Sequence, residues 1–144
     1  MERRVVITGL GTVNPLGNDV QEFWKNIKNA ENGIEKITRI DVSNYPVRIG
    51  GIVKDFDPKK RLDKKEVKRN DLFSQYALYA SVEAVEDSGI KNGNINPEKI
   101  GVIIGNGVGG LETLENNIAK TFTSAKGRMA VQPLLVPRMI SNIG

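Results

Sequence analysis

The sequence contains no cysteine and no histidine. These absences exclude a thiol nucleophile, a disulfide, an imidazole base and the common zinc ligand sets from these residues. We therefore predict no metal site, and any chemistry done by this chain alone would depend on Ser, Thr, Lys, Tyr, Asp or Glu. Aromatic residues make up only 6% of the chain. No apolar run is long enough to cross a membrane, so we predict no membrane partner.

Positive charge is concentrated in one part of the chain. The 144 residues carry a formal net charge of +4. Residues 54–69 alone contain eight basic and four acidic side chains. Lys64 and Lys68 are four residues apart, as are Lys65 and Arg69. On a helix this spacing places each pair on one side. The run is therefore predicted to present a basic helical face.

Three interpretations of this basic face are open. It is a solvated helix face, a nucleic-acid site, or a docking surface for an acidic protein. Residues 59–69 contain neither aromatic residues nor glycine, and single-stranded nucleic-acid sites commonly stack bases on aromatic side chains. We therefore predict no nucleic-acid partner.

Apolar patterns predict alternating strands and helices. The predicted elements are strands at 4–8 and 100–104 and helices at about 18–33, 71–89, 111–122 and from near Pro137 onward. Asn18 with Gln21 predicts a capping box for the first helix. Asp71 and Gly89 predict the start and the end of the second. The small residues on this second helix, Ala80 among them, predict that another element approaches it closely.

Two apolar strands separated by helices indicate an α/β protein with a parallel sheet. Residues 34–70 show no regular pattern and are interpreted as a cap or insertion on that fold. Two strands are too few to complete such a sheet, and the last residues lie within a predicted helix. We therefore expect the sequence to be part of a longer protein.

A glycine-rich loop, Gly105–Gly110, separates a predicted strand from a predicted helix. Its spacing matches the dinucleotide-binding pattern GxGxxG. However, no Asp or Glu follows Glu115, so the carboxylate that would bind a ribose is absent. A nucleotide-binding α/β domain stays an alternative. The glycines could instead permit a tight turn and close packing, or line an acyl pocket with backbone.

The acidic residues of the predicted helices form no convincing acid–base pair. Glu83, Glu86 and Asp87 share one helix, and Glu112 and Glu115 share another. We interpret both groups as solvated helix faces. No catalytic residue is assigned to this sequence.

Ten short motifs are distributed over essentially the whole chain. They are residues 5–17, Phe23–Lys25, Gly33–Ile34, 51–56, Lys65–Glu66, Asp71, Gln75–Ala77, Asp87–Gly89, 103–110 and Val136–Pro137. In this order and spacing they resemble the N-terminal part of the β-ketoacyl-[acyl-carrier-protein] synthases. The resemblance is greatest to the type II synthases of fatty-acid elongation.

The resemblance implies an α/β, thiolase-like fold of two similar halves, layered α/β/α/β/α in a homodimer. Residues 1–144 would form the incomplete N-terminal part of the first half, with a cap at about 34–70. It further implies an acyltransferase of cytoplasmic fatty-acid synthesis, with acyl carrier protein as partner and no cofactor. The family's catalytic Cys, two His and supporting Lys are expected beyond this sequence, so the chain alone is expected to be inactive.

The resemblance also implies two binding sites. Val108 matches the position that gates the acyl pocket, and its branched side chain favours type II. Leu135 and Val136 match residues that line the acyl pocket of the partner subunit. The residues that match the basic patch for the carrier protein are Lys65, Lys68 and Arg69. The alternative from another class is a non-catalytic module that docks carrier proteins or pairs with another subunit.

Overall fold

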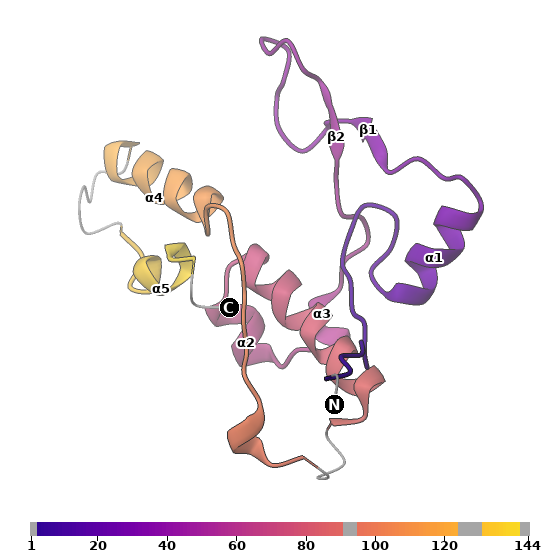
Figure 1. The fold of residues 1–144 in the computed structure, drawn as a ribbon. Helices are drawn as coiled ribbons and strands as arrows, with labels where there is room; N and C mark the ends of the chain where they lie inside the picture. Colours follow the sequence, from indigo (N-terminus) through magenta and orange to yellow (C-terminus); the bar gives the residue numbers. More distant parts are fainter. Residues whose placement is uncertain (1–2, 91–94, 124–130, 142–144) are drawn as a thin grey trace. The chain divides into compact units, whose positions relative to one another are not determined.

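The computed structural model describes residues 3–90, 95–123 and 131–141 (Figure 1). The chain divides into two compact units. Unit 1 comprises residues 1–57 and 79–94, and unit 2 comprises residues 58–78 and 95–144. The long helix α3 (Leu72–Ser88) begins in unit 2 and ends in unit 1. Among the described residues, no helix is both long enough and apolar enough to span a bilayer.

Helix α1 (Val20–Lys28) is the first helix of unit 1. Its N-cap is Asp19, whose carboxylate accepts the Glu22 amide at 2.7 Å. The prediction that Asn18 caps this helix is therefore wrong by one residue, and the Asn18 amide group donates instead to the Lys54 carbonyl at 2.7 Å. The helix also ends earlier than predicted, because Ala30 adopts a left-handed φ of 55°.

A short antiparallel hairpin follows α1. Strands β1 (Ile34–Lys36) and β2 (Ile49–Gly51) pair in the register Ile34↔Gly51. They enclose the loop at the tip of unit 1 in Figure 1. These strands are not predicted from the sequence, because each is only three residues long. A period of two cannot be recognised over that length.

Residues 4–8 and 100–104 were predicted as buried strands, and both predictions are wrong for this structure. Neither segment forms a strand, and the only sheet within the described ranges is the β1–β2 pair. The apolar side chains are exposed, with Ile7 at 83% and Ile103 at 99%. A β-branched run becomes a strand only when another strand satisfies its amide and carbonyl groups. No described strand supplies that partner here.

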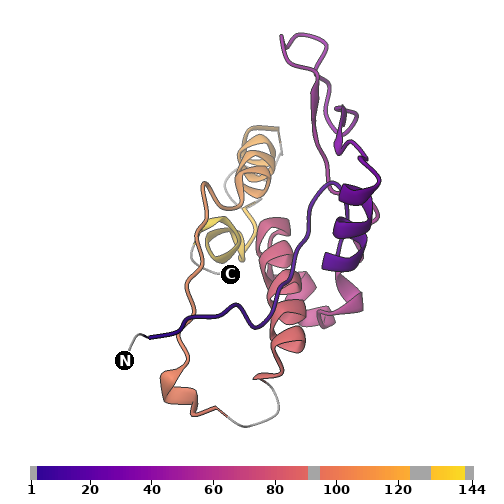
Figure 2. The same ribbon diagram turned by 45° about the vertical axis from the view of Figure 1, so that its right-hand side comes forward.

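The N-terminal segment of unit 1 lies against α3, as Figure 2 shows. A Cβ on Gly9 would lie 2.1 Å from the Ala84 carbonyl oxygen, and one on Gly11 would lie 1.9 Å from that of Ala80. The close approach predicted from the small residues of α3 is confirmed. Only glycine permits main chain to pack this tightly on a helix.

Two α3 carboxylates hold this segment. The Glu83 carboxylate accepts the Thr12 amide at 3.1 Å and the Val20 amide at 2.9 Å. The Asp87 carboxylate accepts the Leu10 amide at 3.0 Å. The interpretation as a solvated helix face is therefore wrong for Glu83, which is half-buried, whereas Asp87 is exposed as predicted. They satisfy backbone donors that would otherwise lack protein partners.

Unit 2 contains the remaining elements. They are the 3₁₀ turns η1 (Pro58–Lys60) and η3 (Pro97–Lys99), α2 (Lys64–Arg69), the first turns of α3, α4 (Leu111–Thr123) and α5 (Leu135–Met139). The predicted helix at 111–122 is confirmed. The predicted stop of α3 is also confirmed, since Gly89 has a φ of 71°. Helix α5 begins two residues before Pro137 rather than at it.

Candidate functional site

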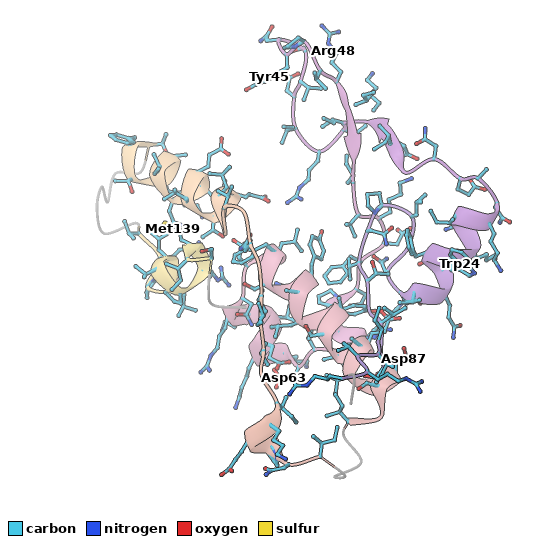
Figure 3. All side chains as sticks on the ribbon, in the orientation of Figure 1. Trp24, Tyr45, Arg48, Asp63, Asp87 and Met139 are labelled. Carbon is cyan, nitrogen blue, oxygen red and sulfur yellow. The ribbon has the colours of Figure 1, made fainter. Side chains whose placement is uncertain are left out.

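Helix α2 carries the predicted docking residues. Its N-cap, Asp63, accepts the amides of Lys65 at 2.6 Å and Glu66 at 2.8 Å. The Glu66 carboxylate accepts the Asp63 amide in return, at 2.9 Å. This capping box fixes the start of a helix of only six residues (Figure 3). Hydrogen bonds from the Glu66 and Lys65 amides hold the pKa of Asp63 below its ordinary value.

The helical spacing predicted for the basic run is confirmed. Lys65, Lys68 and Arg69 all lie on α2 and are exposed. Lys68 and Arg69 stand in the last turn, where cations interact favourably with the negative end of the helix dipole. The structure therefore presents these three cations, together with Lys64, on one short helix.

Arg138 of α5 holds the C-terminal end of α2. Its Nη2 donates to the carbonyl of Lys68, and its Nε donates to the carbonyl of Arg69 at 3.3 Å. Its Nη1 lies 3.5 Å from Oε1 of Gln132. Terminal helix carbonyls have no partner within their own helix. Arg138 supplies donors to two of them, although it is about 70 residues away in the sequence.

The glycine loop packs on the C-terminal end of α5. The Gly110 amide donates to the Met139 carbonyl at 3.1 Å, and Figure 3 labels Met139 at this end of α5. A Cβ on Gly110 would lie 2.2 Å from the Arg138 carbonyl oxygen. Gly109 has a φ of 83°. These two glycines support the interpretation as a tight turn with close packing.

Asn117 joins α4 to the segment that leads into α5. Its side chain is 2% exposed. Its Nδ2 donates to the Thr113 carbonyl at 2.8 Å, and its Oδ1 accepts the Gln132 amide at 3.0 Å. Asn117 is not among the residues predicted from the sequence. The signal that could have indicated it is an asparagine in the middle of a predicted helix. Asparagine is unfavourable in a helix interior unless its side chain has a defined partner.

The start of α4 does not favour a dinucleotide. The Asp71 carboxylate accepts a hydrogen bond from the Thr113 hydroxyl in the first turn. A Cβ on Gly110 would lie 2.9 Å from the same carboxylate. In the dinucleotide fold a phosphate lies at this end of the helix. Here a carboxylate stands close to that place, and it would repel one.

The predicted acyl-pocket residues lie on the packed loop and on α5. Two loop residues separate Val108 from the first residue of α4, and Val108 is 69% exposed. Leu135 is half-buried and Val136 is 60% exposed. The loop of Val108 is bonded to the helix of Leu135 and Val136 through Gly110 and Met139. The structure thus gathers the loop and α5 into one assembly of unit 2.

Comparison with known proteins gives consistent results. The chain matches the family model "Beta-ketoacyl synthase, N-terminal domain" over residues 2–143. It is 43% identical to the 3-oxoacyl-[acyl-carrier-protein] synthase 2 of Synechocystis sp. over 142 residues, which are 99% of this chain and 34% of that protein. It is 45% identical to the synthase 2 of Staphylococcus aureus over 141 residues, 98% of this chain and 34% of that protein. The chain spans about a third of the length of these relatives.

A solved complex resembles the chain as well. It is described as a type II PKS acyl-carrier protein in complex with its ketosynthase bound to the hexaketide. The TM-score is 0.74 at 23% identity, over 99% of this chain and 36% of that chain. This likeness confirms the expected α/β, thiolase-like fold. The chain belongs to the β-ketoacyl synthase family, whose N-terminal domain it matches over nearly its whole length.

Proposed function

We propose that this chain is the N-terminal part of a type II 3-oxoacyl-[acyl-carrier-protein] synthase, here termed the complete enzyme. That enzyme would condense malonyl-carrier with acyl-carrier in cytoplasmic fatty-acid elongation. The observation that carries the proposal is the identity of 43–45% to synthases of that name over almost the whole chain. The family membership supports the same reaction class.

In the proposed reaction, an acyl group moves from its carrier to a Cys thiolate. Malonyl-carrier then loses CO₂, and the resulting carbanion attacks the acyl thioester. Such chemistry needs an activated nucleophile and donors for the developing oxyanion. This chain has no Cys and no His, so its residues would bind and position, and the reacting groups would lie in other parts of the complete enzyme.

The basic face of α2 is the proposed docking surface for acyl carrier protein. Lys65, Lys68 and Arg69 are exposed there, and an acidic partner would be attracted and oriented by them. A structural neighbour of this chain is a ketosynthase in complex with an acyl-carrier protein. That complex supports an acyl-carrier protein as the class of partner.

The loop and α5 are the proposed acyl-binding part of this chain. Val108 would limit the depth of the pocket, and Leu135 and Val136 would line the pocket of the second subunit in a homodimer. The exposure of Val108 and Val136 supports this role, because apolar side chains left open on one subunit are suited to contact a ligand or a partner.

The test is to read the coding frame beyond Gly144 and to measure the intact mass of the native protein. We expect a longer protein with a Cys and two His downstream. The purified protein should release CO₂ from malonyl-carrier when acyl-carrier is present. A stop codon after Gly144, with a native mass to match, would refute the enzyme and leave the docking or subunit-pairing module.

A further inference from the structure

Helix α2 is too short to hold its own position. It has six residues, and isolated helices shorter than about 12 residues are marginal in water. Its first turn is fixed by the capping box of Asp63 and Glu66. Its last turn is held from outside, by the guanidinium of Arg138 on the carbonyls of Lys68 and Arg69. The direction of the docking cations therefore depends on a residue outside the helix.

An arginine is well suited to this contact. Its planar guanidinium offers five donors in a fixed arrangement, so one side chain can bind two neighbouring carbonyls. Its positive charge also lies at the negative end of the α2 dipole. A lysine would keep the charge but not the fork. The two hydrogen bonds to carbonyls therefore fix the position of the C-terminal end of α2 more precisely than the positive charge alone would.

Arg138 also reaches the acyl-binding assembly. It stands one turn after Leu135 on α5. Its main-chain carbonyl oxygen would lie only 2.2 Å from a Cβ added to Gly110, so the two backbones pack closely. One residue therefore contacts α2 through its side chain and the loop of Val108 through its backbone.

We propose that Arg138 is a positioning residue, which sets the orientation of the α2 docking face for the carrier and links that face to α5. This inference rests on the proposed function. It assigns Arg138 no contact with substrate and no part in the chemistry. It predicts that loss of the guanidinium impairs the use of carrier-borne substrate while leaving the reaction itself intact.

The experiment compares two acyl donors in the complete enzyme. One is the acyl group carried on acyl carrier protein (acyl-carrier). The other is the same acyl group on pantetheine (acyl-pantetheine), which cannot bind the docking face. For Arg138→Met we expect KM for acyl-carrier to rise about three- to tenfold, as for loss of hydrogen bonds to a charged group. We expect kcat, and KM for acyl-pantetheine, to stay within twofold of wild type. Lys120→Met, which removes an exposed charge from α4, is the matched control and should leave both KM values unchanged.

Two further variants separate positioning from charge. Arg138→Lys keeps the cation, and we expect it to recover only part of the lost KM. In a variant with Lys65, Lys68 and Arg69 all changed to Glu, Arg138→Met should add less than twofold, because the docking face is already lost. Hydrogen exchange of residues 64–69 should be faster in Arg138→Met than in wild type.

Specific outcomes would overturn the inference. They are an unchanged KM for acyl-carrier in Arg138→Met, full recovery by Arg138→Lys, or an equal loss with acyl-pantetheine. By contrast, a wild-type protein that condenses neither acyl donor with malonyl-carrier would refute the proposed function itself.

Discussion

The carboxylate of Glu83 accepts the amide of Val20 at 2.9 Å, although the two residues are 63 positions apart. Val20 is the first residue of α1, and its amide has no partner within that helix. The second Glu83 oxygen accepts the Thr12 amide at 3.1 Å. One carboxylate on α3 therefore joins the N-terminal segment to the start of α1.

Replacement of Glu83 by Gln should destabilise unit 1. The Gln side chain has one acceptor oxygen, and its amide group would face one of the two backbone donors. We expect a loss of about 1–3 kcal/mol, the cost of a part-buried donor left without a partner. Urea unfolding of the complete enzyme measures this loss, and hydrogen exchange at Thr12 and Val20 locates it. Glu115→Gln, on an exposed position of α4, is the control, and equal effects of the two changes would contradict the prediction.

Gly110→Ala should destabilise the loop that carries Val108. A Cβ there would lie 2.2 Å from the Arg138 carbonyl, so the loop or α5 must shift. We expect a loss of about 1–3 kcal/mol, as for overpacking, together with weaker protection of the Gly110 amide. The control is Gly50→Ala, whose Cβ would meet Ile37 at an ordinary 3.4 Å. Equal melting temperatures for Gly110→Ala and Gly50→Ala would contradict the prediction, because they would show that the close packing of Gly110 on the Arg138 carbonyl does not contribute to stability.

Features that depend on local sequence were predicted well. The helix at 111–122, the stop at Gly89 and the helical spacing of the basic run all follow from residues close together in the chain. The runs at 4–8 and 100–104 have the composition of strands, but a strand also needs a partner. That partner is not among the described residues, so composition alone was misleading.

Contacts between distant residues could not be predicted. No pattern indicates that Arg138 binds the end of α2, or that Glu83 binds the start of α1. The docking and acyl-pocket residues came from the family resemblance, and the residues that hold them in place came only from the structure. Asn117 lies between these two cases. Its place within a predicted helix can be read from the sequence, but its burial and its partners are known only from the structure.

The capping of α2 should depend on pH. The folded pKa of Asp63 is lower than the ordinary value, because the Glu66 and Lys65 amides bind its charged form. The cap is therefore fully present above about pH 4 and is lost as pH falls through the folded pKa. Hydrogen exchange of residues 64–69, corrected for intrinsic rates, should rise at acid pH relative to the rest of the protein. Asp63→Asn, which cannot titrate, should show a smaller rise, and an identical rise would exclude Asp63 as the cause.

Val108→Gly should lengthen the acyl chains that the complete enzyme accepts. The change removes three carbon atoms from the proposed gate. Each further methylene buried is worth about 0.8 kcal/mol, roughly fourfold in kcat/KM. The measurement is kcat/KM for a series of acyl-carrier substrates of increasing length. Val47→Gly, at an exposed position of the hairpin loop, should leave the profile unchanged. An unchanged profile in Val108→Gly would refute the gate.

Reversal of the docking charges should weaken carrier binding in a salt-dependent way. With Lys65, Lys68 and Arg69 all changed to Glu, we expect Kd for acyl carrier protein to rise by about ten- to a hundredfold at low salt. The difference from wild type should shrink as salt rises, because the Debye length falls to about 3 Å at 1 M. Titration calorimetry at several salt concentrations measures both effects.

The control variant reverses Lys99 and Lys120 to Glu, which changes charge elsewhere in unit 2. Its Kd for acyl carrier protein should rise less than that of the variant with Lys65, Lys68 and Arg69 changed to Glu. The docking face is excluded if the triple variant binds like wild type at low salt, and a loss that persists unchanged at high salt would point to misfolding of α2 instead.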